Sequence, residues 1–111
     1  MTTQPIIATL GELILRLKPP GKLRLRQAER FDVCHGGAEA NVAGSLAQFG
    51  LESRFISALP TSELGEQALM SIRANGVNVS HVVRLPGRMG IYFLEDGADI
   101  RLEGLQRLHR I

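Results

Sequence analysis

The sequence contains one cysteine, one tyrosine and no tryptophan, and it has no long hydrophobic run. A single cysteine excludes an internal disulfide framework. No apolar stretch approaches the roughly 18 to 20 residues that a membrane-spanning helix needs. The start of the chain, from Met1 to Pro5, lacks the basic and apolar regions of a secretory signal. These absences predict a protein of the reducing cytoplasm with no membrane partner.

An excess of charge of either sign is also missing. The 13 lysines and arginines stand against 11 aspartates and glutamates, and a formal charge of +2 indicates no nucleic-acid partner. A length of 111 residues with 44% hydrophobic side chains is ordinary for one small domain with its own core. Cys34 and His35 are adjacent, but one such pair makes neither a metal site nor a nucleophile site. We assign both to structure and expect no bound metal.

A pair of glycines joins a predicted strand to a predicted helix. Residues 31–34 alternate as in a half-buried strand, and apolar residues then recur at helical spacing over 40–50. Because Gly36 and Gly37 have no Cβ, a bound molecule can approach the main chain closely, and the first N–H groups of the helix point outward. The pattern predicts a ligand-binding corner. A tight turn with packing glycines fits it equally well.

Strands are also predicted before the glycines. The apolar run 6–10 is typical of a buried strand, and residues 13–18 alternate as a strand with one wet face. Two prolines and a glycine at 19–21 interrupt the alternation, which resumes at 23–26, so a hairpin standing partly off the main sheet is expected. Its basic residues favour a charged edge strand over a site that steers an anionic ligand. They are Arg16, Lys18, Lys22, Arg24, Arg26 and Arg30.

Strands and helices alternate after the glycines. Residues 54–59 form a predicted strand, and a helix enters at 60–63 and ends at Asn75-Gly76. This order with short connections is typical of right-handed βαβ units on a mostly parallel sheet, so the predicted fold class is α/β. The expected apolar stripe of the helix consists of Leu64, Ala68, Leu69 and Ile72.

The last part of the chain is predicted to form antiparallel strands. Runs at 79–85 and 89–95 are separated by a turn at 86–88, and residues 100–102 follow a further turn. Tyr92 lies in the second run. A lone tyrosine in a strand is usually half-buried with its hydroxyl in water, and contact with a ligand is the alternative.

The stretch Gly36-Gly37-Ala38-Glu39-Ala40-Asn41-Val42-Ala43 resembles the N-terminal signature of the ribokinase-like (PfkB-type) sugar kinases. The resemblance extends, in the expected order, over 11–12, 48–51, 55–59, 63–65 and 76–81, and covers residues 5 to about 101. Within the family the chain is most similar to the 2-keto-3-deoxygluconate kinases. Glu39 stands where fructokinase-like members tend to have proline, and 90–95 resembles a Gly-Leu-Tyr strand of that subgroup. The resemblance implies βαβ units on a mostly parallel sheet plus a small antiparallel lid.

The resemblance also implies a site for an acid sugar. Gly37, Ala38, Glu39 and Asn41 would line this site, and Tyr92 would close over it from the lid strands. The Asn41 amide both donates and accepts hydrogen bonds, and main-chain N–H groups near Gly37 suit an anionic or carbonyl oxygen. Because the Glu39 carboxylate would repel the acid group of the sugar, we expect it to accept from hydroxyls or from the helix start.

The chain departs from the family in what it lacks. Family kinases are longer, and a Gly-Ala-Gly-Asp motif in their C-terminal half forms an anion hole and supplies the catalytic base. This sequence has no such motif. We expect residues 1–101 to be the substrate-binding and lid part, and residues 102–111 to be a tail outside the family pattern. The family uses ATP and Mg; we expect neither to bind this chain, and no catalytic residue is assigned.

Two functions stay open at this point. One is the N-terminal fragment of a 2-keto-3-deoxygluconate kinase, without catalysis by itself. The other is a non-catalytic module that binds a sugar acid or pairs through its lid, including a homodimer through the lid strands. A Rossmann-type nucleotide binder is disfavoured because Gly36-Gly37 is not Gly-x-Gly-x-x-Gly. A fragment of this kind should expose apolar surface and an open sheet edge, with low stability as the consequence.

Overall fold

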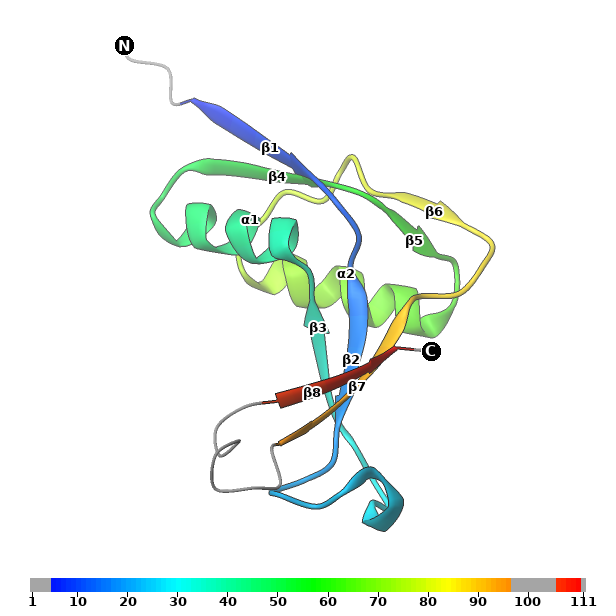
Figure 1. Cartoon of the computed structure of the whole chain (residues 1–111). Coiled ribbons are helices and arrows are strands. Elements are labelled where there is room, and N and C mark those ends of the chain that lie inside the picture. Colours follow the sequence, from blue (N-terminus) through cyan, green and yellow to red (C-terminus); the bar gives the residue numbers. More distant parts are fainter. Residues whose placement is uncertain (1–4, 97–105, 111) are drawn as a thin grey trace. The chain divides into compact units, whose positions relative to one another are not determined.

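The computed structural model describes residues 5–96 and 106–110, which form two compact units (Figure 1). Unit 1 comprises Met1–Leu13 and His35–Met89, and unit 2 comprises Ile14–Cys34 and Gly90–Ile111. Neither helix of the described chain has the length and apolar character needed to cross a membrane.

Unit 1 is built from parallel strand pairs, which confirms the predicted α/β class. Its strands are β1 (Ile6–Leu10), β4 (Glu52–Ile56), β5 (Ala58–Pro60) and β6 (Val83–Leu85). Strand β1 pairs with β4, and β5 pairs with β6, both in parallel. The amide of Val83 donates to the carbonyl of Ser57 at 3.0 Å, so β6 continues along the residue that joins β4 to β5.

Two helices connect these strands and begin and end where the sequence predicts. Helix α1 (Ala38–Gln48) follows the N-cap residue Gly37, and helix α2 (Glu63–Ala74) follows Ser62. The Ser62 hydroxyl accepts a hydrogen bond from the Gly65 amide at 3.4 Å. Beyond the helix ends, Gly50 and Gly76 have φ of 84° and 85°, a left-handed conformation that glycine adopts without a steric penalty.

Both helices lie on the same side of the strands (Figure 1). The Ser53 hydroxyl, 2% exposed at the residue level, donates to the Ala43 carbonyl of α1 at 2.7 Å. On the same face of the chain, Phe55 is 0% and Leu59 is 2% exposed. Gly65 of α2 lies so close to the Pro60 carbonyl that a Cβ would overlap it. The core of unit 1 therefore lies between this sheet face and the two helices.

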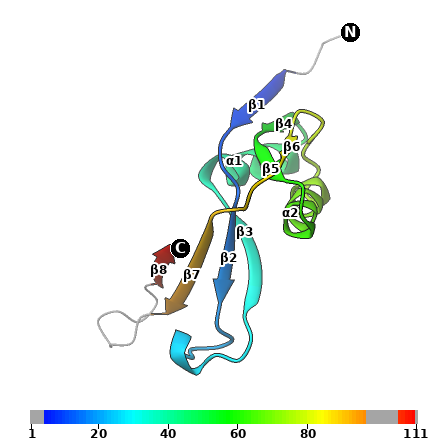
Figure 2. The ribbon, with the colours of Figure 1, turned by 90° about the vertical axis from the view of Figure 1, so that its right-hand side faces the viewer.

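Unit 2 is a mixed sheet in the order β3-β2-β7-β8 (Figure 2). These strands are β2 (Ile14–Lys18), β3 (Asp32–Gly36), β7 (Ile91–Asp96) and β8 (Gln106–Arg110). Strands β2 and β7 are parallel, whereas β7 and β8 are antiparallel. Leu15 is 4% and Leu94 is 5% exposed, and the rings of Phe31 and Phe93 meet edge to face with centroids 5.3 Å apart.

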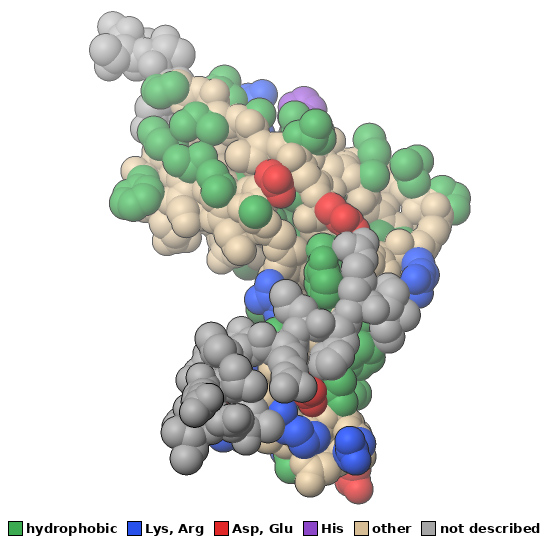
Figure 3. All heavy atoms as spheres, in the orientation of Figure 1, with side chains coloured by type: hydrophobic (Ala, Val, Ile, Leu, Met, Phe, Trp, Pro, Cys, Tyr) green, Lys and Arg blue, Asp and Glu red, His purple; other side chains and the backbone are tan. Residues whose placement is uncertain are grey.

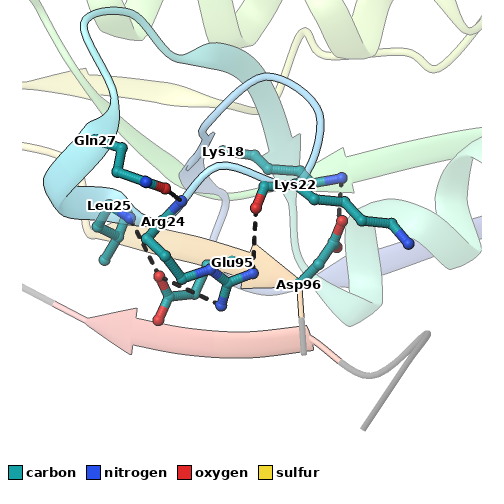
Figure 4. A network of polar contacts seen from close by, with 7 residues as sticks. All are labelled: Lys18, Lys22, Arg24, Leu25, Gln27, Glu95 and Asp96. Carbon is teal, nitrogen blue, oxygen red and sulfur yellow. Dashed lines mark hydrogen bonds and ion pairs between the residues drawn. The ribbon is translucent and has the colours of Figure 1, made fainter. Parts of the chain in front are cut away.

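The hairpin predicted from residues 23–26 is wrong. This segment contains a short 3₁₀ helix, η1 (Leu25–Gln27), because nearby side chains satisfy its backbone groups (Figure 4). The Arg24 amide donates to the Gln27 side-chain oxygen at 2.9 Å, and the Leu25 amide donates to the Glu95 carboxylate at 3.2 Å. Local side-chain acceptors thus compete successfully with strand pairing.

The interpretation of the basic residues as the guard of an edge strand is also wrong. Strand β2 lies inside the sheet, between β3 and β7. Two of these basic residues instead form ion pairs with acidic residues at the end of β7 (Figure 4). Lys18 lies 3.5 Å from Asp96, and the Arg24 guanidinium lies 3.9 Å from Glu95.

The strands predicted at 79–85 and 89–95 do not pair with each other. Strand β6 covers only 83–85, because the Asn78 side chain accepts a hydrogen bond from the Ser80 amide at 2.9 Å and forms a turn before the strand. It runs parallel to β5. The second run becomes β7, which pairs in parallel with β2. The run at 100–102 lies outside the described residues.

Burial differs from the prediction at two elements. In β1, Ile6 is 54% and Leu10 is 71% exposed, and the residues of the other face, Ile7 and Thr9, are half-buried. In α2, Ala68 and Ile72 are buried as expected, but Leu64 is 46% exposed. Gly65, rather than Leu64, faces the strand there, because only a residue without a side chain fits against Pro60.

Candidate functional site

The double-glycine corner forms as predicted, at the junction of β3 and α1. Gly36 is the last residue of β3, and Gly37 has φ 157° and ψ 138° before α1 starts at Ala38. A Cβ on Gly37 would overlap the carbonyl oxygen of Glu12. The glycine is therefore required by close backbone packing as well as by its φ, and this contact holds the start of α1 against the end of the β1 segment.

A second glycine, which sequence reasoning did not assign to the site, completes this packing. An ideal Cβ on Gly11 would lie 2.5 Å from Oε2 of Glu39 and 2.8 Å from its Cβ. The Glu39 side chain thus lies directly over Gly11. The only sequence signal for this position was the Gly11-Glu12 pair within the family resemblance, because the contact joins residues far apart in the chain.

The first turn of α1 offers backbone N–H groups that no side chain caps. Gly37 has no side chain to cap the helix, and no side-chain hydrogen bond caps it. The backbone N–H of Asn41 donates to the Gly37 carbonyl at 3.0 Å, which is the first hydrogen bond of the helix. Ala38, Glu39 and Asn41 are exposed. Glu39 in the first turn interacts favourably with the helix dipole, and the N-terminal N–H groups suit an oxygen ligand.

A hollow in unit 1 adjoins this corner through Gly11 and Glu12. It has a volume of about 600 Å³, and it lies at the carboxyl ends of β1 and β4. It is lined by Leu10, Gly11, Glu12, Ile56, Ser57, Ala58, His81 and Val83. The carboxyl ends of parallel strands are the usual place for ligands in open α/β sheets. None of the site residues predicted from the sequence lines this hollow.

The five predicted site residues divide between the two units. Gly37, Ala38, Glu39 and Asn41 follow one another in unit 1, where the structure brings them against the Gly11 segment. Tyr92 belongs to unit 2 and is half-buried on β7. In the strand ladder it is the partner of Arg16 on β2 and of Arg110 on β8.

Cys34 and His35 precede the corner. Cys34 is exposed and forms no disulfide. Burial lowers the pKa of the His35 imidazole below its ordinary value of 6.5, because desolvation disfavours the charged ring. Among the residues that the structure describes, no three His, Cys, Asp or Glu side chains gather as metal ligands.

Comparison with known proteins places this arrangement in a family. The pfkB family of carbohydrate kinases matches residues 5–102, and the chain belongs to this family. The predicted resemblance to PfkB-type kinases is thereby confirmed. Its restriction to an N-terminal portion is confirmed too, because this chain covers only about a third of the relatives' length.

Relatives that phosphorylate acid sugars by name are among the most similar proteins. The chain is 33% identical over 91 residues to a 2-dehydro-3-deoxygalactonokinase of Haloferax volcanii, a match that covers 82% of this chain and 29% of the relative. It superimposes on the crystal structure of 2-dehydro-3-deoxygluconokinase from Thermotoga maritima with a TM-score of 0.86 and 44% identity. That match covers 93% of this chain and 31% of the Thermotoga chain.

A crystal structure of a putative 2-keto-3-deoxygluconate kinase from Enterococcus faecalis agrees with these matches. Its TM-score is 0.84 at 31% identity, and the match covers 94% of this chain and 30% of that one. The chain therefore spans about a third of the length of the relatives it matches. It matches one part of each of these longer kinases.

Proposed function

We propose that this chain is the substrate-binding N-terminal part of a kinase for 2-keto-3-deoxygluconate or a closely related acid sugar, and that it does not transfer phosphate by itself. The observation that supports it most is the packing of Gly37 against Glu12 and of Glu39 over Gly11. This packing presents the uncapped start of α1 and the exposed Asn41 on one surface.

The chemistry of this surface suits a keto sugar acid. The N–H groups of the first turn of α1 donate to a keto or carboxylate oxygen. The Asn41 amide donates to one oxygen and accepts from a hydroxyl. The Glu39 carboxylate accepts from a second hydroxyl and repels negative charge, so the acid end of the sugar binds away from Glu39.

Phosphoryl transfer requires groups that position a nucleotide and neutralise its charge. An uncharacterized sugar kinase from Pyrococcus horikoshii, 26% identical to this chain with a TM-score of 0.81, was crystallised with ATP. In this chain the 600 Å³ hollow is lined by Glu12, Ser57 and His81 besides Gly11 and apolar residues, with no lysine or arginine. The lining thus offers no lysine or arginine to neutralise phosphates, and the Gly-Ala-Gly-Asp sequence is absent from the chain. We therefore propose that ATP and Mg bind only to the longer kinase.

Titration with acid sugars tests the binding proposal. Tyr92 is the only tyrosine and there is no tryptophan, so tyrosine fluorescence reports on Tyr92 alone, and calorimetry gives the dissociation constant. We expect 2-keto-3-deoxygluconate to bind more tightly than fructose. Asn41→Ala should raise the dissociation constant about tenfold, the loss of roughly 1.4 kcal/mol of hydrogen bonding. Ser45→Ala, one turn along α1 and also exposed, is the matched control.

A coupled assay of ADP release tests the lack of catalysis. We expect no turnover of 2-keto-3-deoxygluconate with MgATP, whereas a longer kinase of the family assayed in parallel turns over. Measurable turnover by this chain would show that phosphate transfer needs none of the missing sequence. Sugar binding without turnover would equally fit a non-catalytic binding module, and restored turnover on adding the rest of a family kinase would favour the kinase fragment.

We also propose that two copies pair through the small sheet of unit 2, in the reducing cytoplasm. Strand β3 lies at the end of the strand order, and Val33 on it is 49% exposed. A sheet edge with exposed apolar residues is a template for a second strand. Light scattering after size exclusion should show a dimer that Val33→Lys shifts to monomer. Val42→Lys, at a 50% exposed position on α1, should leave it unchanged.

A further inference from the structure

The central strands of unit 2, β2 and β7, place an arginine beside the chain's only tyrosine. Residues that are partners in a parallel ladder point to the same side of the sheet, and successive residues along a strand alternate between its two sides. Leu17 is the partner of Phe93 on one side, where Leu15 is 4% exposed. Arg16 is the partner of Tyr92 on the other side. We call this second side the Arg16 face.

The Arg16 guanidinium has no counterion in the described part of the chain. Its Nε is buried, and no described residue accepts a hydrogen bond from it. Among the described residues, no acidic side chain forms an ion pair with Arg16. The Nε of Arg54 is also buried without a hydrogen bond, but Glu52 lies 3.5 Å from it and neutralises its charge. Because a buried charge is costly unless it is paired, Arg16 points to an anionic ligand.

Two neighbouring cations of unit 2 are already paired. Lys18, two residues after Arg16 and on the same face, lies 3.5 Å from Asp96, and Arg24 lies 3.9 Å from Glu95. In the described residues of unit 2, lysines and arginines outnumber aspartates and glutamates, and Figure 3 shows Lys and Arg side chains gathered over this unit. Such a surface raises the local concentration of anions, while the two ion pairs leave Arg16 to contact one.

We propose that Arg16 and Tyr92 form a carboxylate-binding site on the Arg16 face, and that its ligand is the 2-keto acid end of the acid sugar. The choice of this ligand rests on the proposed function, whereas the site itself rests on unit 2 alone. A guanidinium offers Nε–H and an Nη–H side by side, which matches the two oxygens of a carboxylate. Tyr92 is half-buried beside Arg16, and a phenolic hydroxyl is a donor for the neighbouring keto oxygen.

The charge of the site favours a carboxylate over a phosphate. One guanidinium compensates the single charge of a carboxylate, whereas a phosphate carries more than one negative charge at neutral pH. Leu94, two residues after Tyr92 on the Arg16 face, is 5% exposed, so part of this face is shielded from water. Lys18 cannot compensate the additional charge of a phosphate without giving up Asp96. The desolvation cost of that charge therefore selects the carboxylate.

Magnetic resonance of the wild-type chain, labelled with nitrogen-15 arginine, tests the site without a sugar. Pyruvate is the smallest 2-keto acid and carries none of the sugar hydroxyls. We expect pyruvate to shift the Nε–H resonance of Arg16 until the shift saturates, and inorganic phosphate to shift it less. Arg16→Lys removes this resonance and so assigns it. Lys18→Gln, which loses the same charge from the same strand and face, is the matched control and should keep the pyruvate shift.

Calorimetry with 2-keto-3-deoxygluconate and its methyl ester tests the ligand. The ester has no charge but keeps the keto group and every hydroxyl. We expect the wild-type chain to bind the acid about tenfold more tightly than the ester, as for a charge-assisted hydrogen bond. Arg16→Gln should abolish this preference and change the dissociation constant of the ester by less than about twofold. Lys18→Gln should keep the preference.

The outcomes separate this site from the proposed function. Equal binding of acid and ester, with an Arg16 resonance that pyruvate leaves unchanged, overturns the carboxylate site while sugar binding stands. A pyruvate shift in a chain that binds neither acid nor ester upholds the site and overturns the proposed function, and with it the sugar as ligand. A larger shift with phosphate overturns the choice of a carboxylate. Equal loss of preference in Lys18→Gln and Arg16→Gln overturns the site as well, because general surface charge would then discriminate acid from ester.

Discussion

At the scale of single residues, the glycines that build the corner are constrained by their neighbours more than by their backbone angles. Gly37 faces the Glu12 carbonyl, and Gly11 lies under the Glu39 side chain. Gly50 offers a contrast, because it has φ 84° but no atom near the position of a Cβ. A turn glycine and a packing glycine can thus be separated by substitution.

Gly37→Ala should lower the free energy of unfolding by at least about 2 kcal/mol, since the new methyl overlaps a backbone oxygen that cannot move cheaply. Gly50→Ala should cost only about 1 kcal/mol, the strain of a left-handed alanine. Urea unfolding of both variants measures the difference. Equal costs would mean that the backbone around Glu12 adjusts to admit a side chain.

His35 should make stability depend on pH. Burial holds the pKa of the folded chain's imidazole below its ordinary 6.5, so the unfolded chain binds the proton more readily. The free energy of unfolding therefore falls as pH drops below about 6.5, and this contribution levels off below the pKa in the folded state. Above about pH 7 the residue is neutral in both states and has no effect.

His35→Gln should reduce the fall in the free energy of unfolding as pH drops below about 6.5, measured by urea unfolding at matched ionic strength. A profile for His35→Gln that parallels the wild type would assign the acid sensitivity to carboxylates instead.

At the scale of elements, the corner between β5, α2 and β6 is held by one arginine. Arg84 donates from Nε to the Pro60 carbonyl at 2.9 Å and from Nη1 to the Glu66 carboxylate at 2.7 Å. Its Nη2 donates to the Ser62 carbonyl at 3.3 Å. Three acceptors from a strand end, a cap and a helix converge on one planar group, which suits arginine and no other side chain.

Arg84→Lys should therefore lower the free energy of unfolding by about 1 to 2 kcal/mol, although the charge is kept, because an ammonium cannot reach all three acceptors. Arg88→Lys, at an exposed position in the following turn, should change it by less than about 0.5 kcal/mol. Thermal unfolding by circular dichroism distinguishes the two. Similar values would show that the ion pair with Glu66 alone, and not the forked geometry, stabilises this corner.

At the scale of the whole molecule, helices α1 and α2 cover one face of the strands of unit 1, and the opposite face, which we call the open face, exposes apolar side chains of β1 and β6. Phe55 on the covered face is 0% exposed, whereas Leu10 on the open face is 71% exposed. The sequence predicts low stability, and this asymmetry supports the prediction, since each exposed apolar side chain forgoes roughly 1.5 to 3 kcal/mol of burial. Exposed apolar side chains such as Leu10 also promote self-association.

A double variant, Leu10→Lys with Val83→Lys, should reduce the fluorescence of the dye ANS and the light scattering of the isolated chain, because it removes exposed apolar surface. Its melting temperature should stay within a few degrees of the wild type, since neither side chain is buried. Phe55→Ala is the opposite control and should destabilise the chain by about 3 to 5 kcal/mol. Strong destabilisation by the lysine variant would place its two positions in the core.

Much of this architecture could be predicted from local signals. Periodicity and caps located β1, α1 and α2, because Gly37, Ser62 and Gly50 act on the backbone within a few residues of themselves. The eight-residue stretch that starts at Gly36 indicated the kinase family, which the match over residues 5–102 confirms. The roles of Glu39, Asn41 and Tyr92 in binding a sugar stay predictions.

Other features were decided only by tertiary contacts. Residues 23–26 alternate like a strand, but Glu95 accepts from the Leu25 amide from 70 residues away and a 3₁₀ helix forms instead. Strand β2 gained a parallel partner in β7, a pairing for which adjacent sequence carries no signal. Tertiary structure alone also decided the contact of Glu39 with Gly11 and the exposure of Ile6 and Leu10 on β1. Sequence alone determined where the chain turns and caps, since those energies are local, whereas pairing and coverage depend on partners distant in sequence.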